Sequence, residues 1–262
     1  MGRAPPLPGV QTSFTNCCRT DALADGVPHP QLPLDFAPRD GATFDDFVPG
    51  ESGLTVDLLR HLADGDGERQ ALLWGVAGSG KSHLLNAACQ RAAGRGERVA
   101  MLPLGELFDA TADGAPGPEL LDGLESLALV CLDDLQRVAG RDAWEEALFD
   151  LINRARDGGC RMLFACDDNP AALGLSLPDL RSRLAWGPVL RLRAADDTQL
   201  AEILSRRAAA LGLDLGEGVL RYLMTRYARD LRAALARLQL LDHASLAAQR
   251  RLTVPFVKSV LG

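Results

Sequence analysis

The sequence predicts an α/β protein in which helices flank a parallel five-stranded sheet and a small all-helical domain follows. Short apolar runs have the composition of strands buried on both faces, and helical periods alternate with them. After about residue 194 the strand patterns stop, which predicts the helical domain. The apolar runs are ALLWG (71–75), VAMLPL (99–104), LALVCLDD (127–134), RMLFAC (161–166) and PVLRL (188–192).

The predicted helices place apolar residues at i, i+3, i+4 and i+7, the spacing of a helix that packs one face on a sheet. Segments 82–93 and 143–156 show this spacing between strands, which indicates right-handed βαβ units. In the second domain, Asp196 followed by Gln199 has the pattern of a capping box that opens a helix. Helices are predicted there at 198–211, 216–228, 229–249 and 253–261.

The chain divides into four predicted parts. Residues 1–28 are rich in Pro, Gly and small polar residues without periodicity, so we expect a disordered extension. Residues 29–41 form a short apolar peptide and a linker, 42–193 the α/β domain, and 194–262 the helical domain.

Composition excludes several classes of protein. The 262 residues carry 35 acidic and 28 basic side chains, and a net charge of −7 argues against charge-driven attachment to nucleic acid or to an anionic membrane. Six cysteines without a CxxC pair or a histidine at ligand spacing argue against a zinc site and indicate a reducing compartment. No apolar run reaches the ~20 residues of a membrane span, and the N-terminus lacks the pattern of a signal peptide. We therefore predict a cytoplasmic protein that does not contact a membrane.

A phosphate-binding loop lies between the first predicted strand and the helix after it. GVAGSGKS fits GxxxxGK[ST] in the context that this motif requires. The glycines let backbone amides wrap the phosphates, the lysine neutralises the β and γ oxygens, and the final serine hydroxyl can bind Mg²⁺. The loop consists of Gly75, Val76, Ala77, Gly78, Ser79, Gly80, Lys81 and Ser82.

Two carboxylates follow the apolar strand LALVCLDD. They emerge at the sheet edge beside the loop, where one can hold Mg²⁺ through water. We assign Asp133 to the metal and Asp134 to the orientation or deprotonation of an attacking water.

Further polar groups leave alternatives open. RMLFACDDNP ends a strand in Asp167, Asp168 and Asn169, at the edge where α/β sheets bind ligands. An arginine from the pair Arg181 and Arg183 could act on a neighbouring subunit's γ-phosphate, although most exposed arginines are solvated or weakly paired. In the helical domain, either arginine of Arg229 and Arg232 could reach the phosphates or form a surface ion pair.

Six segments together resemble the AAA+ ATPases, specifically the DnaA clade. The match covers about residues 29–262, and it is closest to short regulatory members that lack the initiator's C-terminal DNA-binding domain. Because the sequence ends at Gly262, the resemblance implies that this domain is lacking here too. The segments are TFDDFVPGES, GVAGSGKS, LVCLDDLQ, FACDDNP, LRSRLAWG and ARDLRAAL.

The resemblance implies a role for individual residues. Lys81 and Ser82 match the phosphate loop, and Asp133 and Asp134 match the Walker B pair. It further implies that Asp167 is the sensor 1 residue, Arg183 the arginine finger and Arg229 the sensor 2 arginine. Phe47 and Val48 fall in the segment that forms the adenine pocket. The cofactor implied is ADP or ATP with Mg²⁺, held as a structural nucleotide, with ADP favoured in the active regulator.

The peptide before the fold resembles the clamp-binding motif of this clade. Gln31, Leu32, Leu34 and Phe36 would dock on the DNA polymerase sliding clamp, with the apolar side chains in a groove and the Gln31 amide making directional hydrogen bonds. The resemblance then implies a negative regulator of replication initiation that stimulates ATP hydrolysis by DnaA. It would meet DNA only indirectly, through the clamp, and could form homo-oligomers.

Two other functions remain open. The intact Walker elements also fit an ATPase that remodels a helicase or loads a clamp by its own turnover. A non-catalytic replication adaptor, in which nucleotide only stabilises the fold, is the third reading. Autonomous ATPase activity, lost on Asp134→Asn, would favour the ATPase.

Overall fold

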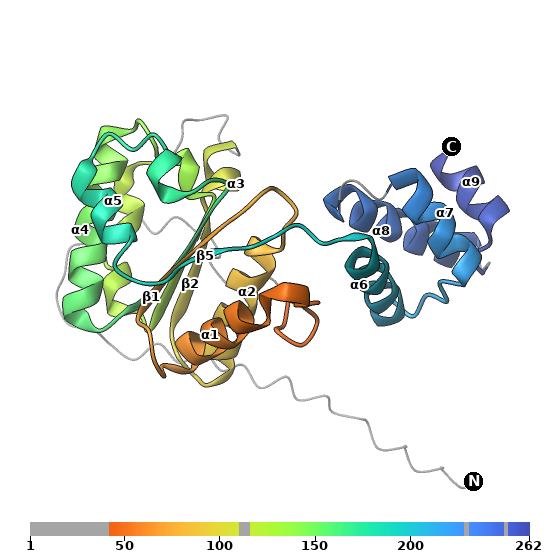
Figure 1. The fold of residues 1–262 in the computed structure, drawn as a ribbon, viewed down its shortest axis with the longest axis horizontal. Coiled ribbons are helices and arrows are strands. Elements are labelled where there is room, and N and C mark those ends of the chain that lie inside the picture. The colour runs from red at the N-terminus through yellow and green to blue at the C-terminus, as the bar shows by residue number, and fades with distance from the viewer. Residues whose placement is uncertain (1–41, 110–115, 228–230, 249–250) are drawn as a thin grey trace, which may run out of the picture. The chain divides into compact units, whose positions relative to one another are not determined.

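The computed structural model describes residues 42–109, 116–227, 231–248 and 251–262 (Figure 1). The five strands described are all paired in parallel, in the order β2-β3-β4-β1-β5. This arrangement confirms the predicted sheet. The strands are β1 (Gln70–Trp74), β2 (Val99–Pro103), β3 (Leu129–Asp133), β4 (Arg161–Cys166) and β5 (Val189–Arg191).

Helices cover both faces of the sheet, as the alternating pattern predicts. Figure 1 shows α1 (Gly53–Asp64) and α2 (Lys81–Gly94) on one face, with α4 (Asp142–Gly158) and α5 (Pro178–Leu184) on the other. The short α3 (Leu104–Asp109) follows β2, and 3-10 turns lie in several connections. The sequence predicted α2 and α4 within two residues of their observed ends.

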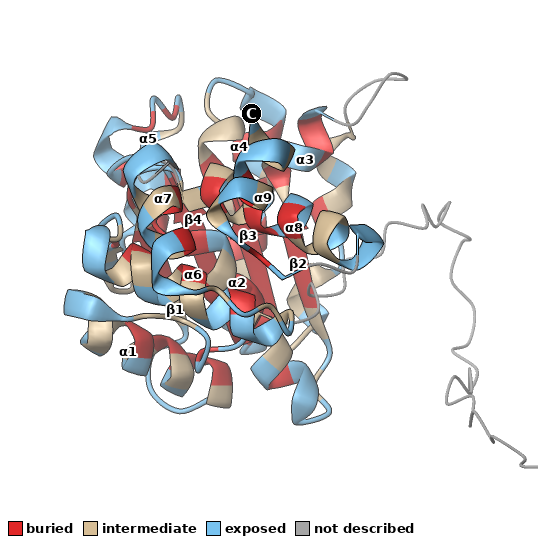
Figure 2. Ribbon diagram, turned by 90° about the vertical axis from the view of Figure 1, so that its right-hand side faces the viewer, coloured by how far each residue is buried: buried red, intermediate tan, exposed pale blue. Residues whose placement is uncertain are grey.

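Successive residues of each central strand enter different hydrophobic clusters, because strand side chains alternate between faces. Leu72 and Phe164 pack with α4, while Leu73 and Leu163 pack with α1 and α2. Every residue of β3 and β4 is buried, which explains why these strands have continuous apolar sequences (Figure 2).

Four cysteines lie in this core without forming disulfides, as expected for small apolar side chains. Burial raises the pKa of Cys160 to about 11 and that of Cys166 to about 12. Both thiols are therefore protonated at neutral pH.

A buried glutamate holds the segment that leads into α5. The Glu145 side chain is 1% exposed and accepts hydrogen bonds from the backbone amides of Gly140, Ser176 and Leu177 at 2.8–3.0 Å. A buried carboxylate needs such donors. Glu145 thereby fixes α5 to α4, and α5 carries the predicted finger arginine.

The predicted helical domain is confirmed. The capping box is present, since the Gln199 amide donates to Asp196 Oδ1 (2.8 Å) and the Asp196 amide donates to Gln199 Oε1 (2.9 Å). Among the described residues no helix is long and apolar enough to cross a membrane. The helices are α6 (Asp197–Ala210), α7 (Glu217–Tyr227), α8 (Leu231–Ala248) and α9 (Val254–Leu261).

Candidate functional site

The phosphate loop connects β1 to the start of α2, as the motif requires. Gly80 has a φ of +98°, and a Cβ there would lie 2.6 Å from the Phe47 ring, so only glycine fits without strain. A Cβ on Gly75 would lie 2.1 Å from the Leu192 carbonyl oxygen. The two glycines therefore let the loop turn closely against its neighbours.

Lys81 lies at the centre of this loop and is only 6% exposed. Its Nζ donates to the carbonyl oxygens of Gly75 (2.6 Å) and Val76 (3.2 Å) and forms an ion pair with Asp167 Oδ1 (3.1 Å). A buried ammonium group surrounded by oxygen atoms is suited to phosphate oxygens as well. The geometry thus brings Lys81 and Asp167 together, at the sheet edge where the sequence placed both.

Ser79 provides a test of whether phosphate fits the loop. Its Oγ is buried and has no hydrogen-bonding partner among the described residues. Because nearly all buried polar groups are hydrogen-bonded, this hydroxyl indicates a partner outside the described residues. A phosphate oxygen has the required acceptor chemistry, so the loop residues fit a nucleotide.

Asp133, the predicted metal-side carboxylate, is buried beside Ser82. Burial raises the pKa of the Asp133 carboxyl, against the hydrogen bond from Ser82, which lowers it. The contact with Ser82 joins the two residues predicted to hold Mg²⁺. No group of three or more His, Cys, Asp or Glu side chains within the described ranges could hold a metal, so a cation here would also need phosphate or water oxygens.

We expect Asp133→Asn to stabilise the protein in the absence of nucleotide and Mg²⁺. A carboxyl whose pKa is raised by folding binds its proton more tightly in the folded state. Its charge therefore opposes folding fully above the raised pKa, and this penalty disappears as the pH falls through that value toward the ordinary one. Urea unfolding from about pH 8 to about pH 4 should show a higher free energy of unfolding for the variant at the upper end, narrowing toward acid. Asp150→Asn, an exposed change, is the control; an equal or lower stability of Asp133→Asn at the upper end would contradict this expectation.

Gln136 ties the second Walker B carboxylate to the predicted sensor. Its Nε2 donates to Asp134 Oδ1 (3.1 Å) and to Asp167 Oδ2 (3.0 Å), and its Oε1 accepts from the Asp167 amide (3.3 Å). Asp134 has a φ of +57°, the only left-handed non-glycine residue among those described. The unusual backbone and the Gln136 contacts together fix the position of Asp134 beside the phosphate loop.

The segment before α1 forms the opposite wall. Phe47 packs near His83, with ring centroids 5.9 Å apart, and His83 Nε2 donates to the Thr43 carbonyl (2.8 Å). Phe47 and Val48 both line the cavity, and their assignment to an adenine pocket stays a prediction.

These parts surround a cavity of about 1010 Å³. Of the predicted nucleotide residues, it is lined by Phe47, Val48, Ala77, Gly78, Ser79, Gly80, Lys81, Ser82, Asp134 and Asp167. Gly75, Val76 and Asp133 do not line it, although Gly75 and Val76 contact Lys81 and Asp133 contacts Ser82. Of the alternatives at the end of β4, Asp168 and Asn169 do not line it either, and the Asn169 side chain instead accepts from the Ala171 amide (3.0 Å).

Arg193 and Arg206, which the sequence did not single out, also line this cavity. Arg193 forms an ion pair with Glu51, and Arg206 Nη1 donates to the Asp45 carbonyl (3.3 Å). Arg232, the alternative to Arg229, is a lining residue too, whereas Arg229 lies outside the described residues. Guanidinium groups bind anions well, and ion pairs join Arg193 to Glu51 and Arg206 to Glu202 in this structure.

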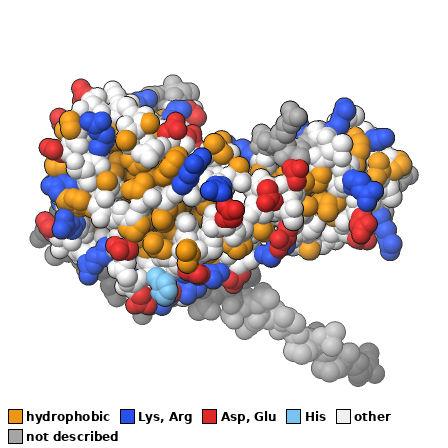
Figure 3. Space-filling model, in the orientation of Figure 1, with side chains coloured by type: hydrophobic (Ala, Val, Ile, Leu, Met, Phe, Trp, Pro, Cys, Tyr) orange, Lys and Arg blue, Asp and Glu red, His pale blue; other side chains and the backbone are white. Residues whose placement is uncertain are grey.

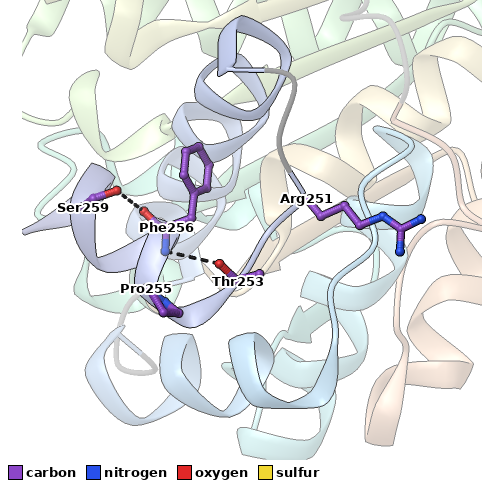
Figure 4. Close-up of a pocket in the computed structure, with 5 residues that line it drawn as sticks. All are labelled: Arg251, Thr253, Pro255, Phe256 and Ser259. Carbon is purple, nitrogen blue, oxygen red and sulfur yellow. Dashed lines mark hydrogen bonds between the residues drawn. The ribbon is translucent and has the colours of Figure 1, made fainter.

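A smaller cavity of about 410 Å³ lies at the start of α9 (Figure 4). Thr253 caps this helix by accepting a hydrogen bond from the Phe256 amide (3.4 Å), and Arg251 extends away from the other lining side chains. No predicted site residue lines this cavity.

Arg183 lies at the end of β1 opposite the phosphate loop. Gln70, the first residue of β1, donates from Nε2 to the carbonyl oxygens of Arg183 (2.7 Å) and Leu184 (3.4 Å). The loop follows the last residue of β1, roughly 13 Å further along the strand at ~3.3 Å per residue. Arg183 accordingly does not line the cavity.

Arg183 differs from Arg181 because its guanidinium lies over two aromatic rings. Its Cζ lies 3.8 Å from the ring centroid of Trp186 and 5.3 Å from that of Phe149. Arg181 is exposed.

The predicted clamp peptide falls outside the described residues. Its predicted contact residues are Gln31, Leu32, Leu34 and Phe36.

Comparisons with known proteins match both domains. Residues 39–191 match the family model described as the bacterial DnaA ATPase domain, and residues 196–261 match the one described as the Hda lid domain. Domain III of the Thermotoga maritima replication initiation protein DnaA superposes with a TM-score of 0.71 at 19% identity, over 85% of this chain and 96% of that one. AMPPCP-bound DnaA from Aquifex aeolicus gives 0.64 at 24% identity, over 78% of this chain and 66% of that one.

A branch migration motor has a similar architecture. The Thermotoga maritima RuvB Holliday junction branch migration motor gives a TM-score of 0.62 at 20% identity, over 84% of this chain and 71% of that one. At such identities the solved structures show the fold, while the family matches carry the relationship.

Proposed function

Because the chain belongs to the bacterial DnaA ATPase-domain family of AAA+ proteins and carries a lid that matches the Hda lid domain, we propose that it is a nucleotide-bound negative regulator of replication initiation. It would bind a DNA-loaded sliding clamp and stimulate ATP hydrolysis by DnaA. Residues 42–193 would form its ATPase-type domain and 194–262 its lid.

One observation carries this proposal. Arg183 is anchored at the opposite end of β1 from the chain's own phosphate loop and does not line the chain's own cavity. This position leaves Arg183 away from the chain's own nucleotide, and in our proposal it acts on a nucleotide held by another molecule. A guanidinium inserted in this way stabilises the charge that develops on a transferring phosphoryl group.

The chain's own nucleotide has a different role. Ser79, Lys81 and Ser82 would bind its phosphates, and Asp133 with Ser82 would hold Mg²⁺, which neutralises phosphate charge when bound. Phe47 and Val48 would contact the base. In this proposal ADP or ATP stabilises the conformation that presents Arg183.

Self-hydrolysis is a second candidate, favoured by Asp134, which lines the cavity and is held by Gln136. A chain acting this way would be an ATPase that remodels a helicase or loads a clamp. Its isolated form would hydrolyse ATP, and Asp134→Asn would abolish the activity.

The clamp-binding half of the proposal is tested by capture on immobilised sliding clamp. We expect the wild-type chain to bind and the double variant Gln31→Ala with Phe36→Ala to lose binding, because these residues supply the directional amide and the aromatic anchor. The control changes Gln11→Ala with Phe14→Ala, the same residue types upstream. Equal capture of both double variants and the wild type would remove the clamp from the proposal.

The hydrolysis half of the proposal is tested by single-turnover hydrolysis of ATP held by DnaA, with Arg183→Ala as the decisive variant.

A further inference from the structure

Trp186 contacts two guanidinium groups from different helices. Arg183 Cζ of α5 lies 3.8 Å from its ring centroid, and Arg156 Cζ of α4 lies 4.1 Å from the same centroid. The indole is still 39% exposed. Neither arginine forms an ion pair with a carboxylate in the part of the chain that the structure describes.

The backbone beneath this cluster is held to the sheet. The Gln70 side chain binds the last carbonyls of α5, and the Trp186 amide donates to the Arg183 carbonyl (3.2 Å). A Cβ on Gly187 would lie 2.0 Å from the Gln70 carbonyl oxygen, so glycine permits this close approach. Residues 183–187 are therefore fixed against the first residue of β1.

The cluster lies beside the open edge of the sheet. β5 has a single neighbouring strand among the described residues, β1, and Val189 at its start is exposed. Figure 3 shows hydrophobic side chains gathered over the region where Figure 1 labels β1 and β5, with basic side chains at the border. A partner can thus reach Trp186 and Arg183 from outside.

We propose that Trp186 is the positioning residue for Arg183: its indole ring holds the guanidinium in the orientation that meets the nucleotide of the docked partner. This inference rests on the proposed function and adds a residue to it. Trp186 itself contacts no nucleotide and is not a catalytic residue.

The physical reason is preorganisation. A free arginine side chain has many rotamers, and holding it near its final position lowers the entropy lost when it meets phosphate. A cation over an aromatic face is attracted by the ring quadrupole. Arg156 shares the ring, and its positive charge repels that of Arg183. This repulsion weakens the hold of the indole on Arg183. The guanidinium can therefore still turn toward a phosphate anion.

The test measures hydrolysis of ATP held by a bacterial DnaA, over a range of concentrations of this chain, with loaded clamps present. We expect Trp186→Leu to lower the maximal rate about 10- to 100-fold and to change the half-saturating concentration less than about twofold. Trp186→Phe keeps an aromatic face and should stay within about threefold of wild type. Leu246→Ala, an exposed apolar change in α8, should match wild type.

Two measurements separate positioning from folding. ADP affinity reports on the intact fold from the opposite end of β1, and we expect it to be unchanged in Trp186→Leu. The NMR signal of the Arg183 Nε–H group should be shifted by the indole ring in wild type and should lose that shift in Trp186→Leu.

The outcomes are distinct. If wild type stimulates DnaA, Arg183→Ala does not, and Trp186→Leu equals wild type, the positioning role is wrong while the proposed function stands. An Arg183 signal unaffected by Trp186→Leu also overturns positioning. If Trp186→Leu raises the half-saturating concentration and leaves the maximal rate unchanged, Trp186 is a docking residue and the positioning role is wrong. If wild type fails to stimulate DnaA, the proposed function falls and the positioning role with it.

Discussion

Arg183→Ala is expected to return hydrolysis of DnaA-bound ATP to the unassisted rate, a loss on the order of 10³-fold or more. An arginine that enters a neighbour's site stabilises charge only as the phosphoryl group transfers, so its removal affects the chemical step. Single-turnover release of phosphate from ATP-loaded DnaA, with clamps and a saturating amount of this chain, measures that step.

Two further variants sharpen the result. Arg183→Lys keeps the charge but loses the planar fork of donors, so we expect an intermediate rate. Arg181→Ala, on the same short helix but exposed, should behave as wild type. Full stimulation by Arg183→Ala, or equal losses for Arg181→Ala and Arg183→Ala, would contradict the role assigned to Arg183.

Lys81→Ala is expected to weaken nucleotide binding about 100-fold or more. Lys81 is a buried ammonium group in the phosphate loop, and its removal leaves the carboxylate of Asp167 without its ion-pair partner beside the phosphates. Titration of the purified chain with a fluorescent ADP measures the dissociation constant. Stimulation of DnaA should fall in parallel, and excess nucleotide should restore part of it.

The sequence offers a matched control for this change. The chain has two lysines, and the second, Lys258, lies in α9 with its Nζ 5.6 Å from the Tyr222 ring centroid. Lys258→Ala should bind ADP as wild type does. Urea unfolding of Lys81→Ala without nucleotide separates lost binding from lost folding. Equal affinity of the two lysine variants would show that the loop does not bind phosphate as proposed.

The fold was predictable because its determinants are local and repetitive. Strands β3 and β4 are buried on both faces, so their sequences are continuous apolar runs bounded by polar residues. The phosphate loop is a contiguous motif, and Lys81 and Asp134 follow from chain position once β1 and β3 are placed. The capping box at Asp196 and Gln199 is likewise contained in four residues.

The remaining parts of the site depend on contacts between distant segments. Gln70 holds Arg183 across 113 residues, and Gln136 reaches Asp167 across 31. Nothing in the local pattern of LDDLQ distinguishes a bridging glutamine from a solvated one. Arg193 and Arg206 line the cavity because the folded chain brings distant segments together, and no local pattern predicts this. Helix α1 was not predicted, although it buries Leu59 and Leu62.

The contacts of Trp186 could likewise be predicted only in part from the sequence. LRSRLAWG places it three residues after Arg183, but its contact with Arg156 joins α4 to the end of α5. Sequence spacing could suggest the first neighbour and not the second. The clamp peptide at Gln31–Phe36 and Arg229 lie outside the described residues and stay predictions.

The most direct measurement follows whose nucleotide is hydrolysed. DnaA is loaded with ATP labelled at the γ-phosphate, this chain is loaded with unlabelled ADP, and clamps on DNA are added. We predict that labelled phosphate is released from DnaA much faster with the wild-type chain than without it, at a rate that depends on Arg183. Release at the same rate with and without the chain would contradict the proposal that its guanidinium acts on a nucleotide held by DnaA.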